Sequence, residues 1–127
     1  MSVLEELKSS TRDSLESKQR ELSELAKKSK DDAFDEEVFR DAMLDVLSQV
    51  RIMYQVTIAQ ARDTQDIDQV AELWKETHLF YKGALSMWQG MNAICGDSPK
   101  DELFVYCGEL IKRLAQASAD QYRFHAE

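Results

Sequence analysis

His78 has the residue type and surroundings that best suit a reactive group in this sequence. Lys82 follows it by four residues, and Gly83 comes directly after that lysine. A neutral imidazole is a nucleophile that can carry a phosphoryl group, and a nearby ammonium would stabilise the added negative charge. The other histidine, His125, follows the last predicted helix. Chemistry at an imidazole would therefore centre on His78.

The order His78-Leu79-Phe80-Tyr81-Lys82-Gly83 is similar to the His-x-x-Lys-Gly motif of histidine phosphotransfer domains, which are acidic helical bundles of about this size. It contains one additional residue. On a helix that residue rotates the lysine by about 100° and places Lys82, rather than a small residue, one turn after the histidine. The resemblance implies a phosphotransfer-type signalling bundle that uses His78 and Lys82, and we keep it as an alternative hypothesis.

The remaining reactive residues lack the spacing that metal binding or catalysis requires. No Glu-x-x-His pair is present, and Glu76 and His78 are two residues apart, which points them to different faces of a helix. Cys107 falls on a predicted core face, while Cys95 lies at a predicted helix end, and neither is placed near a histidine. We therefore expect no metal, no cofactor and no enzymatic activity.

Composition and charge restrict the classes of partner. The 127 residues suit one domain, residues 1–127, and include 24 Asp and Glu against 16 Lys and Arg, for a net charge of −8. Nucleic acids and anionic membranes bind clustered basic residues, so neither is expected as a partner. The excess of acid favours solubility and a basic partner. Two cysteines without a disulfide pattern, and no predicted secretory signal, indicate a cytoplasmic protein.

Four long helices account for the sequence pattern. One proline and four glycines leave little material for turns, and apolar residues recur at helical spacing. We predict helices over about 2–30, 35–62, 66–95 and 98–124, arranged as an all-α, up-down-up-down antiparallel four-helix bundle. Ser2, Asp35 and the segment Gly96-Asp97-Ser98-Pro99 supply capping signals, and Phe34 and Phe39 have hydrophobic-staple spacing. In the first helix we expect a narrow apolar seam of Val3, Leu4, Leu7, Leu15, Leu22 and Leu25.

The third helix carries the clearest apolar pattern. Its seam is expected to comprise Ile67, Val70, Trp74, Thr77, Tyr81, Ala84, Trp88, Met91 and Cys95. Large aromatic residues at heptad spacing are usually core fillers, but a cavity among Trp74, Tyr81, Trp88 and the methionines would bind an apolar small molecule, which is a further alternative function. Trp88-Gln89-Gly90 is similar to the turn of small secreted helical hairpins, although here the core pattern continues past it.

The second helix is apolar on two faces. Ile52, Val56 and Ala59 lie opposite the seam that contains Val50 and Met53. Such a face is either covered by a neighbouring helix or exposed for a partner. Our leading hypothesis is a non-enzymatic bundle, acting as an adaptor, an assembly component or a chaperone-like protein through protein–protein contacts. We expect a homodimer that uses this helix, or the first helix as a coiled coil.

Overall fold

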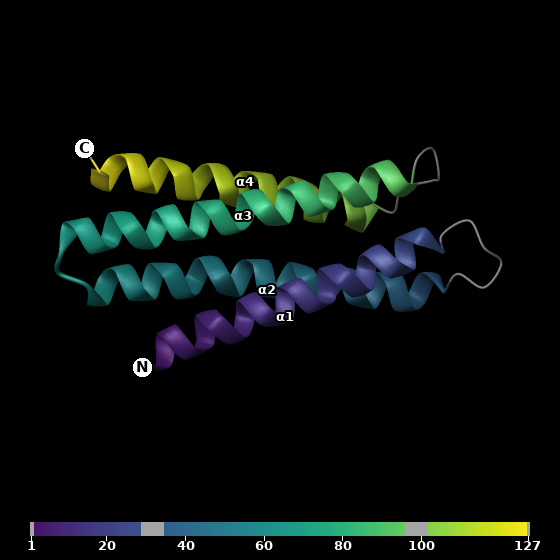
Figure 1. The fold of residues 1–127 in the computed structure, drawn as a ribbon, viewed down its shortest axis with the longest axis horizontal. Helices are drawn as coiled ribbons and strands as arrows, with labels where there is room; N and C mark the ends of the chain where they lie inside the picture. The colour runs from purple at the N-terminus through teal and green to yellow at the C-terminus, as the bar shows by residue number, and fades with distance from the viewer. Residues whose placement is uncertain (1, 29–34, 96–101, 127) are drawn as a thin grey trace.

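The chain forms four helices, each antiparallel to the next along the sequence (Figure 1). The computed structural model describes residues 2–28, 35–95 and 102–126, without the side chains of residues 94 and 95. The helices are α1 (Val3–Lys27), α2 (Glu36–Asp63), α3 (Ile67–Cys95) and α4 (Glu102–Ala126). The predicted all-α four-helix bundle is confirmed, and six of the eight predicted helix ends lie within two residues of the observed ones. The other two predicted ends, 30 and 98, lie outside the described residues.

The helix starts follow the predicted capping chemistry. The side chain of Ser2 accepts a hydrogen bond from the Glu5 backbone N–H at 3.1 Å. Asp35 Oδ1 accepts from the N–H groups of Glu37 and Val38, so each cap satisfies donors that a helix leaves unpaired at its first turn. The predicted turn at 96–99, the side chain of Cys95 and the staple residue Phe34 lie outside the described residues.

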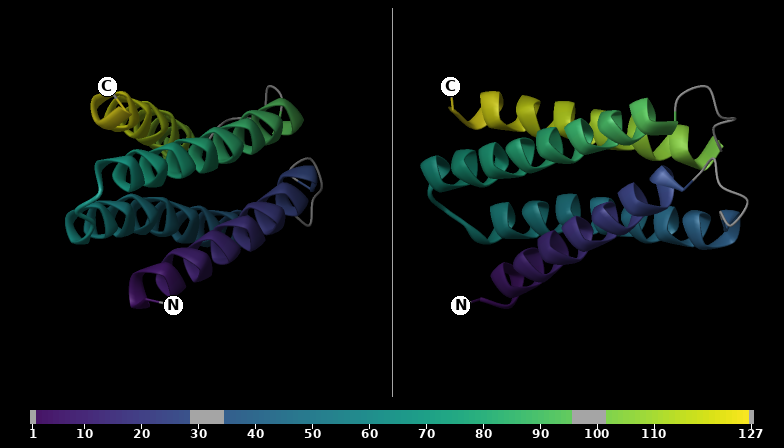
Figure 2. Two further views of the ribbon diagram at one scale, coloured as in Figure 1. Left: turned by 60° about the vertical axis from the view of Figure 1, so that its left-hand side comes forward. Right: turned by 45° about the vertical axis from the view of Figure 1, so that its right-hand side comes forward.

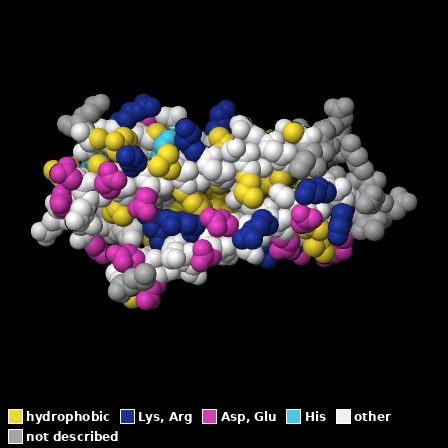
Figure 3. All heavy atoms as spheres, viewed as in Figure 1, with side chains coloured by type: hydrophobic (Ala, Val, Ile, Leu, Met, Phe, Trp, Pro, Cys, Tyr) yellow, Lys and Arg dark blue, Asp and Glu magenta, His cyan; other side chains and the backbone are white. Residues whose placement is uncertain are grey.

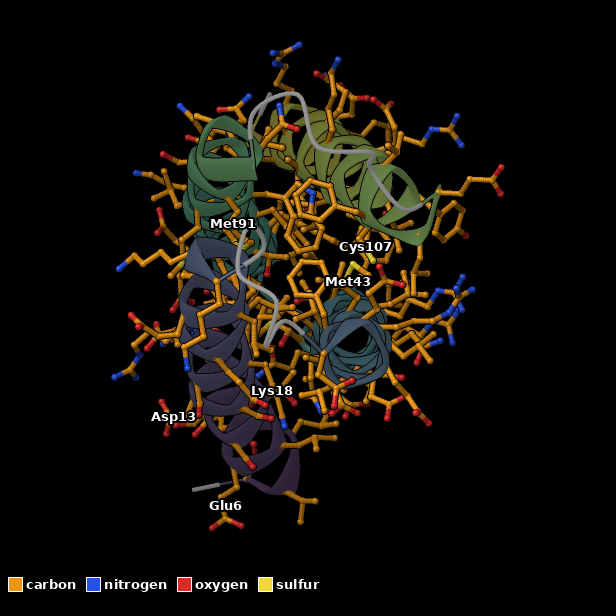
Figure 4. All side chains as sticks on the ribbon, turned by 90° about the vertical axis from the view of Figure 1, so that its right-hand side faces the viewer. Glu6, Asp13, Lys18, Met43, Met91 and Cys107 are labelled. Atoms are coloured by element: carbon orange, nitrogen blue, oxygen red, sulfur yellow. The ribbon has the colours of Figure 1, made fainter. Side chains whose placement is uncertain are left out.

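Two helical hairpins face each other in the bundle. α1 packs mainly on α2, and α3 packs mainly on α4. In the end view, α1 and α4 occupy opposite corners, and within the described residues they make no contact (Figure 4). α2 and α3 meet across the middle, and α1 is inclined to the other helices so that its N-terminal end diverges from them (Figure 2). The boundary between the hairpins therefore runs along the bundle.

The core is built from the predicted seams of α2, α3 and α4. Met43, Val46 and Met53 of α2 are fully buried. Tyr81 of α3 is also fully buried, and Ile111 of α4 is 1% exposed. The pattern fails at the start of α3, where Ile67 is 65% exposed. A seam that repeats every three or four residues thus locates the interior correctly along most of these helices.

The predicted seam of α1 is wrong at its N-terminal half. Val3 is 79% exposed and Leu7 is 43% exposed. The helix instead buries Lys8, Thr11, Leu15, Gln19, Leu22 and Ala26. This rotated seam keeps Leu15 and Leu22 in the core, and it turns polar residues inward where α1 meets the other hairpin. Three of the six buried residues of α1 are therefore polar.

Hydrogen bonds join the two hairpins through the interior. The fully buried Tyr81 hydroxyl donates to the Val50 carbonyl at 2.6 Å, and burial raises the pKa of this phenol far above its ordinary value. Gln19 Nε2 donates to the Ala84 carbonyl, and the hydroxyls of Thr57 and Thr77 lie 2.7 Å apart. Buried polar groups are costly without partners, so these pairs fix how the hairpins are aligned.

Gly108 lets Trp88 approach the backbone of α4. A Cβ atom built on Gly108 would lie 2.8 Å from both Cδ1 and Nε1 of Trp88. The indole N–H of Trp88 donates to the Phe104 carbonyl at 3.1 Å, and its ring stacks on that of Phe104 with centroids 4.6 Å apart. The glycine therefore makes room for an aromatic side chain that joins α3 to α4.

We predict that Gly108→Ala destabilises the protein by about 1–3 kcal/mol, because the new methyl group forces Trp88 away from the helix. Urea denaturation monitored by circular dichroism measures the change. Gly83→Ala and Gly90→Ala are matched controls, since a Cβ atom at either position meets nothing within 4 Å. Those two substitutions should stabilise the protein by about 0.5–1 kcal/mol through helix propensity. A stabilised Gly108→Ala variant would contradict the packing role of Gly108.

Candidate functional site

The second apolar face of α2 lies on the side that α1 crosses. Val56 is 4% exposed, whereas Ile52 and Ala59 are partly buried. At one end of this face Lys18 of α1 pairs with Asp45, and at the other end Lys8 donates to Gln60. Positions 45, 52, 56 and 60 share one side of the helix, so α1 accounts for the burial of Val56. The homodimer that we predict through this face is not tested by a single chain.

His78 is held against the neighbouring helix. Its Nδ1 atom lies 2.8 Å from the Ala115 carbonyl oxygen, which can only accept, so Nδ1 carries the proton. In the neutral ring Nε2 then bears the free lone pair. The side chain is partly buried, and Lys82, one turn later, is exposed. Because Ala115 belongs to α4, this contact joins α3 to α4.

Of Trp74, Tyr81 and Trp88, only Trp74 lines one of the clefts that the described residues form, and the three differ in one further respect. The Tyr81 hydroxyl and the Trp88 indole each donate to a backbone carbonyl of another helix. The indole N–H of Trp74, whose residue is 3% exposed, has no hydrogen-bond partner within the described residues. If an apolar ligand binds among these aromatic residues, Trp74 is therefore the one beside which it is expected.

A surface between α2 and α4 combines exposed apolar side chains with arginines. We define the α2–α4 face by two stripes at helical spacing. On α2 the stripe comprises Arg40, Leu44, Leu47, Arg51, Tyr54, Ile58 and Arg62, and on α4 it comprises Leu103, Tyr106, Leu110, Arg113, Ala117, Gln121 and Phe124. Several of its apolar residues are well exposed: Leu44 by 46%, Tyr106 by 49% and Phe124 by 77%.

Contacts along the bundle show that the two stripes adjoin. Beneath the face, the Cys107 thiol lies 3.7 Å from the Met43 carbonyl, and both residues point into the space between α2 and α4 (Figure 4). At its middle, Arg51 Nη2 donates to the Tyr106 hydroxyl at 3.0 Å. At its far end, Ile58 of α2 and Gln121 of α4 line one cleft. The stripes therefore form one continuous surface.

The α2–α4 face has a charge opposite to that of the whole protein. Neither stripe contains Asp or Glu, although acids outnumber bases in the chain by 24 to 16. Arg51, Arg62 and Arg113 form no salt bridge with any residue that the structure describes. On the opposite side, formed by α1 and α3, basic and acidic side chains are interspersed along an apolar strip (Figure 3). The charged residues within the two stripes are thus all arginines, although Glu36 and Glu109 lie beside them, one helical turn from Arg40 and Arg113.

This face was missed because each stripe lies beside a predicted core seam. Leu47, Tyr54 and Leu110 are partly buried against the core, so their spacing alone does not distinguish them from core residues. The available signal was the recurrence of arginine, since Arg40, Arg51 and Arg62 are spaced by eleven residues, which is close to three helical turns. The net charge of −8 also favoured a basic partner, whereas the arginines of this face suit an acidic one.

A second polar site lies on the other side, where α1 meets α2 and α3. The cleft there has a volume of about 300 Å³ and is lined in part by Lys8, Arg12, Gln60 and Glu76. Lys8 is 6% exposed and donates to Gln60 Oε1 at 3.2 Å. Burial lowers the pKa of its ammonium from the ordinary value of 10.5, with Glu76 opposing this shift and Arg12 adding to it. Arg12 and Glu76 form an exposed ion pair at 3.8 Å, a type that contributes little to stability.

We predict that Lys8→Met changes the pH dependence of stability. With a lowered folded-state pKa, burying the charged ammonium costs stability at every pH below that pKa, and the cost disappears as the pH rises through it towards 10.5. The free energy of unfolding of Lys8→Met minus that of the parent should therefore fall between neutral pH and pH 10.5. Urea denaturation measures it, with the exposed Lys75→Met as control. A constant difference would show that the Lys8 ammonium is not buried.

The described residues contain no metal-binding cluster and no membrane-spanning helix, and no related protein indicates a function. Within residues 2–28, 35–95 and 102–126, no group of three or more His, Cys, Asp and Glu side chains could hold a metal ion. None of the helices, over the same residues, is long and apolar enough to cross a membrane. Comparison of the chain with models of protein families, with curated proteins and with solved structures found no match. Function must therefore be argued from the surfaces themselves.

Proposed function

We propose that the protein is a non-enzymatic interaction module that binds an acidic amphipathic helix of another protein on the α2–α4 face. The observation that supports this proposal is a surface with apolar side chains and arginines but no acid, in a chain of net charge −8. The face runs between two parallel helices, which is the geometry that receives a third helix in a groove. Adaptor, assembly and chaperone-like roles all use such a surface.

The apolar part of the face supplies the affinity in this proposal. Leu44 and Tyr106 are about half exposed, and Leu47, Leu103 and Leu110 are partly buried beside them. Covering apolar surface is favourable by roughly 25 cal/mol per Å². Clustered exposed apolar residues with a polar rim are typical of protein-binding surfaces, whereas isolated ones are ordinary.

The arginines supply the specificity. Arg51 lies between Leu47 and Tyr54 on α2, and Arg113 lies between Leu110 and Ala117 on α4. A guanidinium presents a planar set of donors that suits a carboxylate. Opposite charges at a rim accelerate association and exclude partners of the wrong sign, so a helix with flanking Glu or Asp is favoured over one with flanking Lys.

The proposal is tested with two synthetic helical peptides. One has leucines at positions i, i+3, i+4 and i+7 flanked by glutamates, and the other has lysine in place of each glutamate. We expect the acidic peptide to bind at least about tenfold more tightly, with an affinity that falls as salt is added. Fluorescence anisotropy measures both. Equal binding of the two peptides, or none by either, would reject the proposed partner.

Variants locate the contact. Leu44→Gln and Arg51→Glu should each weaken binding of the acidic peptide by about tenfold or more. The first variant removes an apolar contact from the face, and the second reverses a charge on it. Leu79→Gln and Arg20→Glu are matched controls, since Leu79 is 56% exposed on α3 and Arg20 is exposed on α1. Controls that weaken binding as much as the test variants would place the contact elsewhere.

A second copy of the chain is the other occupant to examine. Light scattering at micromolar concentration measures it directly. A dimer mass that Leu44→Gln and Arg51→Glu reduce to a monomer mass would assign the α2–α4 face to self-association. A monomer mass throughout would remove the expected homodimer and leave a different protein as the partner.

One observation supports phosphotransfer at His78 as a second function. The hydrogen bond from Nδ1 to the Ala115 carbonyl orients the ring and leaves the Nε2 lone pair available for phosphorylation. Phosphoramidate would transfer its phosphoryl group to that nitrogen and release ammonia. Mass spectrometry should then show a mass gain that His78→Gln abolishes and His125→Gln retains. Modification of both histidines alike would indicate nonspecific reactivity and exclude this function.

A further inference from the structure

An open cleft lies at the end of the α2–α4 face, beside the turn between α2 and α3. Its volume is about 480 Å³, which is within the range of small-molecule sites. Its wall is largely apolar, because α2 and α3 both turn aliphatic and aromatic side chains towards it at this point. The apolar residues are Tyr54, Ile58, Ala61, Ile67, Val70 and Trp74.

The polar residues of this cleft are basic or neutral. Arg62 and His125 line it, and no Asp or Glu does. Four acids are next to lining residues in the sequence, namely Asp63, Asp66, Asp68 and Asp120, but none of them lines the cleft. Asp63 lines the cleft on the α1 side, Asp66 Oδ1 accepts from the Asp68 N–H at 2.9 Å, and Asp120 Oδ1 accepts from Gln116 Nε2 at 3.0 Å. The other clefts described in the structure each include at least one Glu. An anion therefore meets no carboxylate in the lining of this one.

Trp74, which lines the cleft, carries a polar group without a hydrogen-bond partner among the described residues. Its buried indole N–H has no partner in the described part of the chain, and neither has the buried Ser118 hydroxyl. His78 and Ala115 are in contact, so Trp74 and Ser118 lie about one turn further along their antiparallel helices and at a similar level. Buried Trp N–H groups usually have an acceptor, and unsatisfied groups of this kind concentrate at functional sites.

We propose that this cleft binds a small amphipathic carboxylate, with its apolar part against Tyr54, Ile58 and Trp74 and its carboxylate at Arg62. The guanidinium can donate two parallel hydrogen bonds to a carboxylate, and His125 also lines the cleft. A volume of about 480 Å³ suits a chain of medium length or a single aromatic ring system better than a long lipid.

This site does not depend on the proposed function. The peptide test uses the central part of the α2–α4 face, at Leu44 and Arg51, whereas the cleft uses Arg62, His125 and the start of α3. A chain that binds the acidic peptide but no carboxylate, or the reverse, distinguishes the two proposals.

The experiment titrates octanoate, octylammonium and octan-1-ol separately into the full chain. The chain has two tryptophans, so two indole N–H signals are expected in a nitrogen–proton correlation spectrum, and Trp74→Phe identifies the one from Trp74. Octanoate should shift the Trp74 signal and leave the Trp88 signal in place, since Trp88 already donates to Phe104. Octylammonium should bind at least about tenfold more weakly.

Variants separate the charge from the apolar wall. Arg62→Gln should weaken the binding of octanoate by about tenfold and leave the binding of octan-1-ol unchanged. Ala61→Phe, which fills the cleft, should abolish the binding of both compounds. Arg20→Gln is the matched control, because Arg20 lines a different groove, between α1 and α3. The proposal is overturned if octanoate leaves the Trp74 signal unmoved, if octylammonium binds equally well, or if Arg62→Gln and Arg20→Gln have the same effect.

Discussion

The hydrogen bond from the Tyr81 hydroxyl to the Val50 carbonyl sets the alignment of the two hairpins on which every surface of the molecule depends. The phenol is fully buried, and a buried hydroxyl without an acceptor would cost roughly 1–3 kcal/mol. Apolar side chains alone tolerate sliding of one helix past another, but a directional bond of 2.6 Å does not. The Thr57–Thr77 and Gln19–Ala84 contacts repeat this constraint along the boundary. The stripes of α2 and α4 are adjacent because of this alignment.

The absence of Asp and Glu from the two stripes reconciles an acidic chain with a locally basic surface. A net charge of −8 describes the molecule at distances beyond the Debye length, which is about 8–10 Å at physiological salt. At contact distance only the local residues count, and on the α2–α4 face these are arginines and apolar side chains. In the proposed complex, an acidic partner would therefore be recognised at short range, by residues such as Arg51 and Arg113.

The sequence predicted the architecture well because repeated apolar spacing and capping residues act locally. The seams of α2 and α3 and the caps at Ser2 and Asp35 all followed from such signals. The seam of α1 was mispredicted, because Lys8 and Gln19 become interior residues only when Gln60 and the Ala84 carbonyl are brought to them by the fold. The α2–α4 face was missed for a related reason. Which flank of a seam faces solvent depends on how the hairpins are placed, and spacing within one helix carries no information about that.

The polar seam of α1 has a consequence for the order in which the molecule opens. Helices held by fewer apolar contacts exchange their amide hydrogens through local opening, at a smaller free energy than global unfolding requires. α1 exposes Val3 and Leu7 and buries Lys8, Thr11 and Gln19, so its attachment gains less from the hydrophobic effect than that of the other helices. If α1 detached, Val56 and Ile52 would become exposed, and the three remaining helices would present an additional apolar surface. The first helix would thus control access to this apolar surface of α2, because the surface is exposed only while α1 is detached.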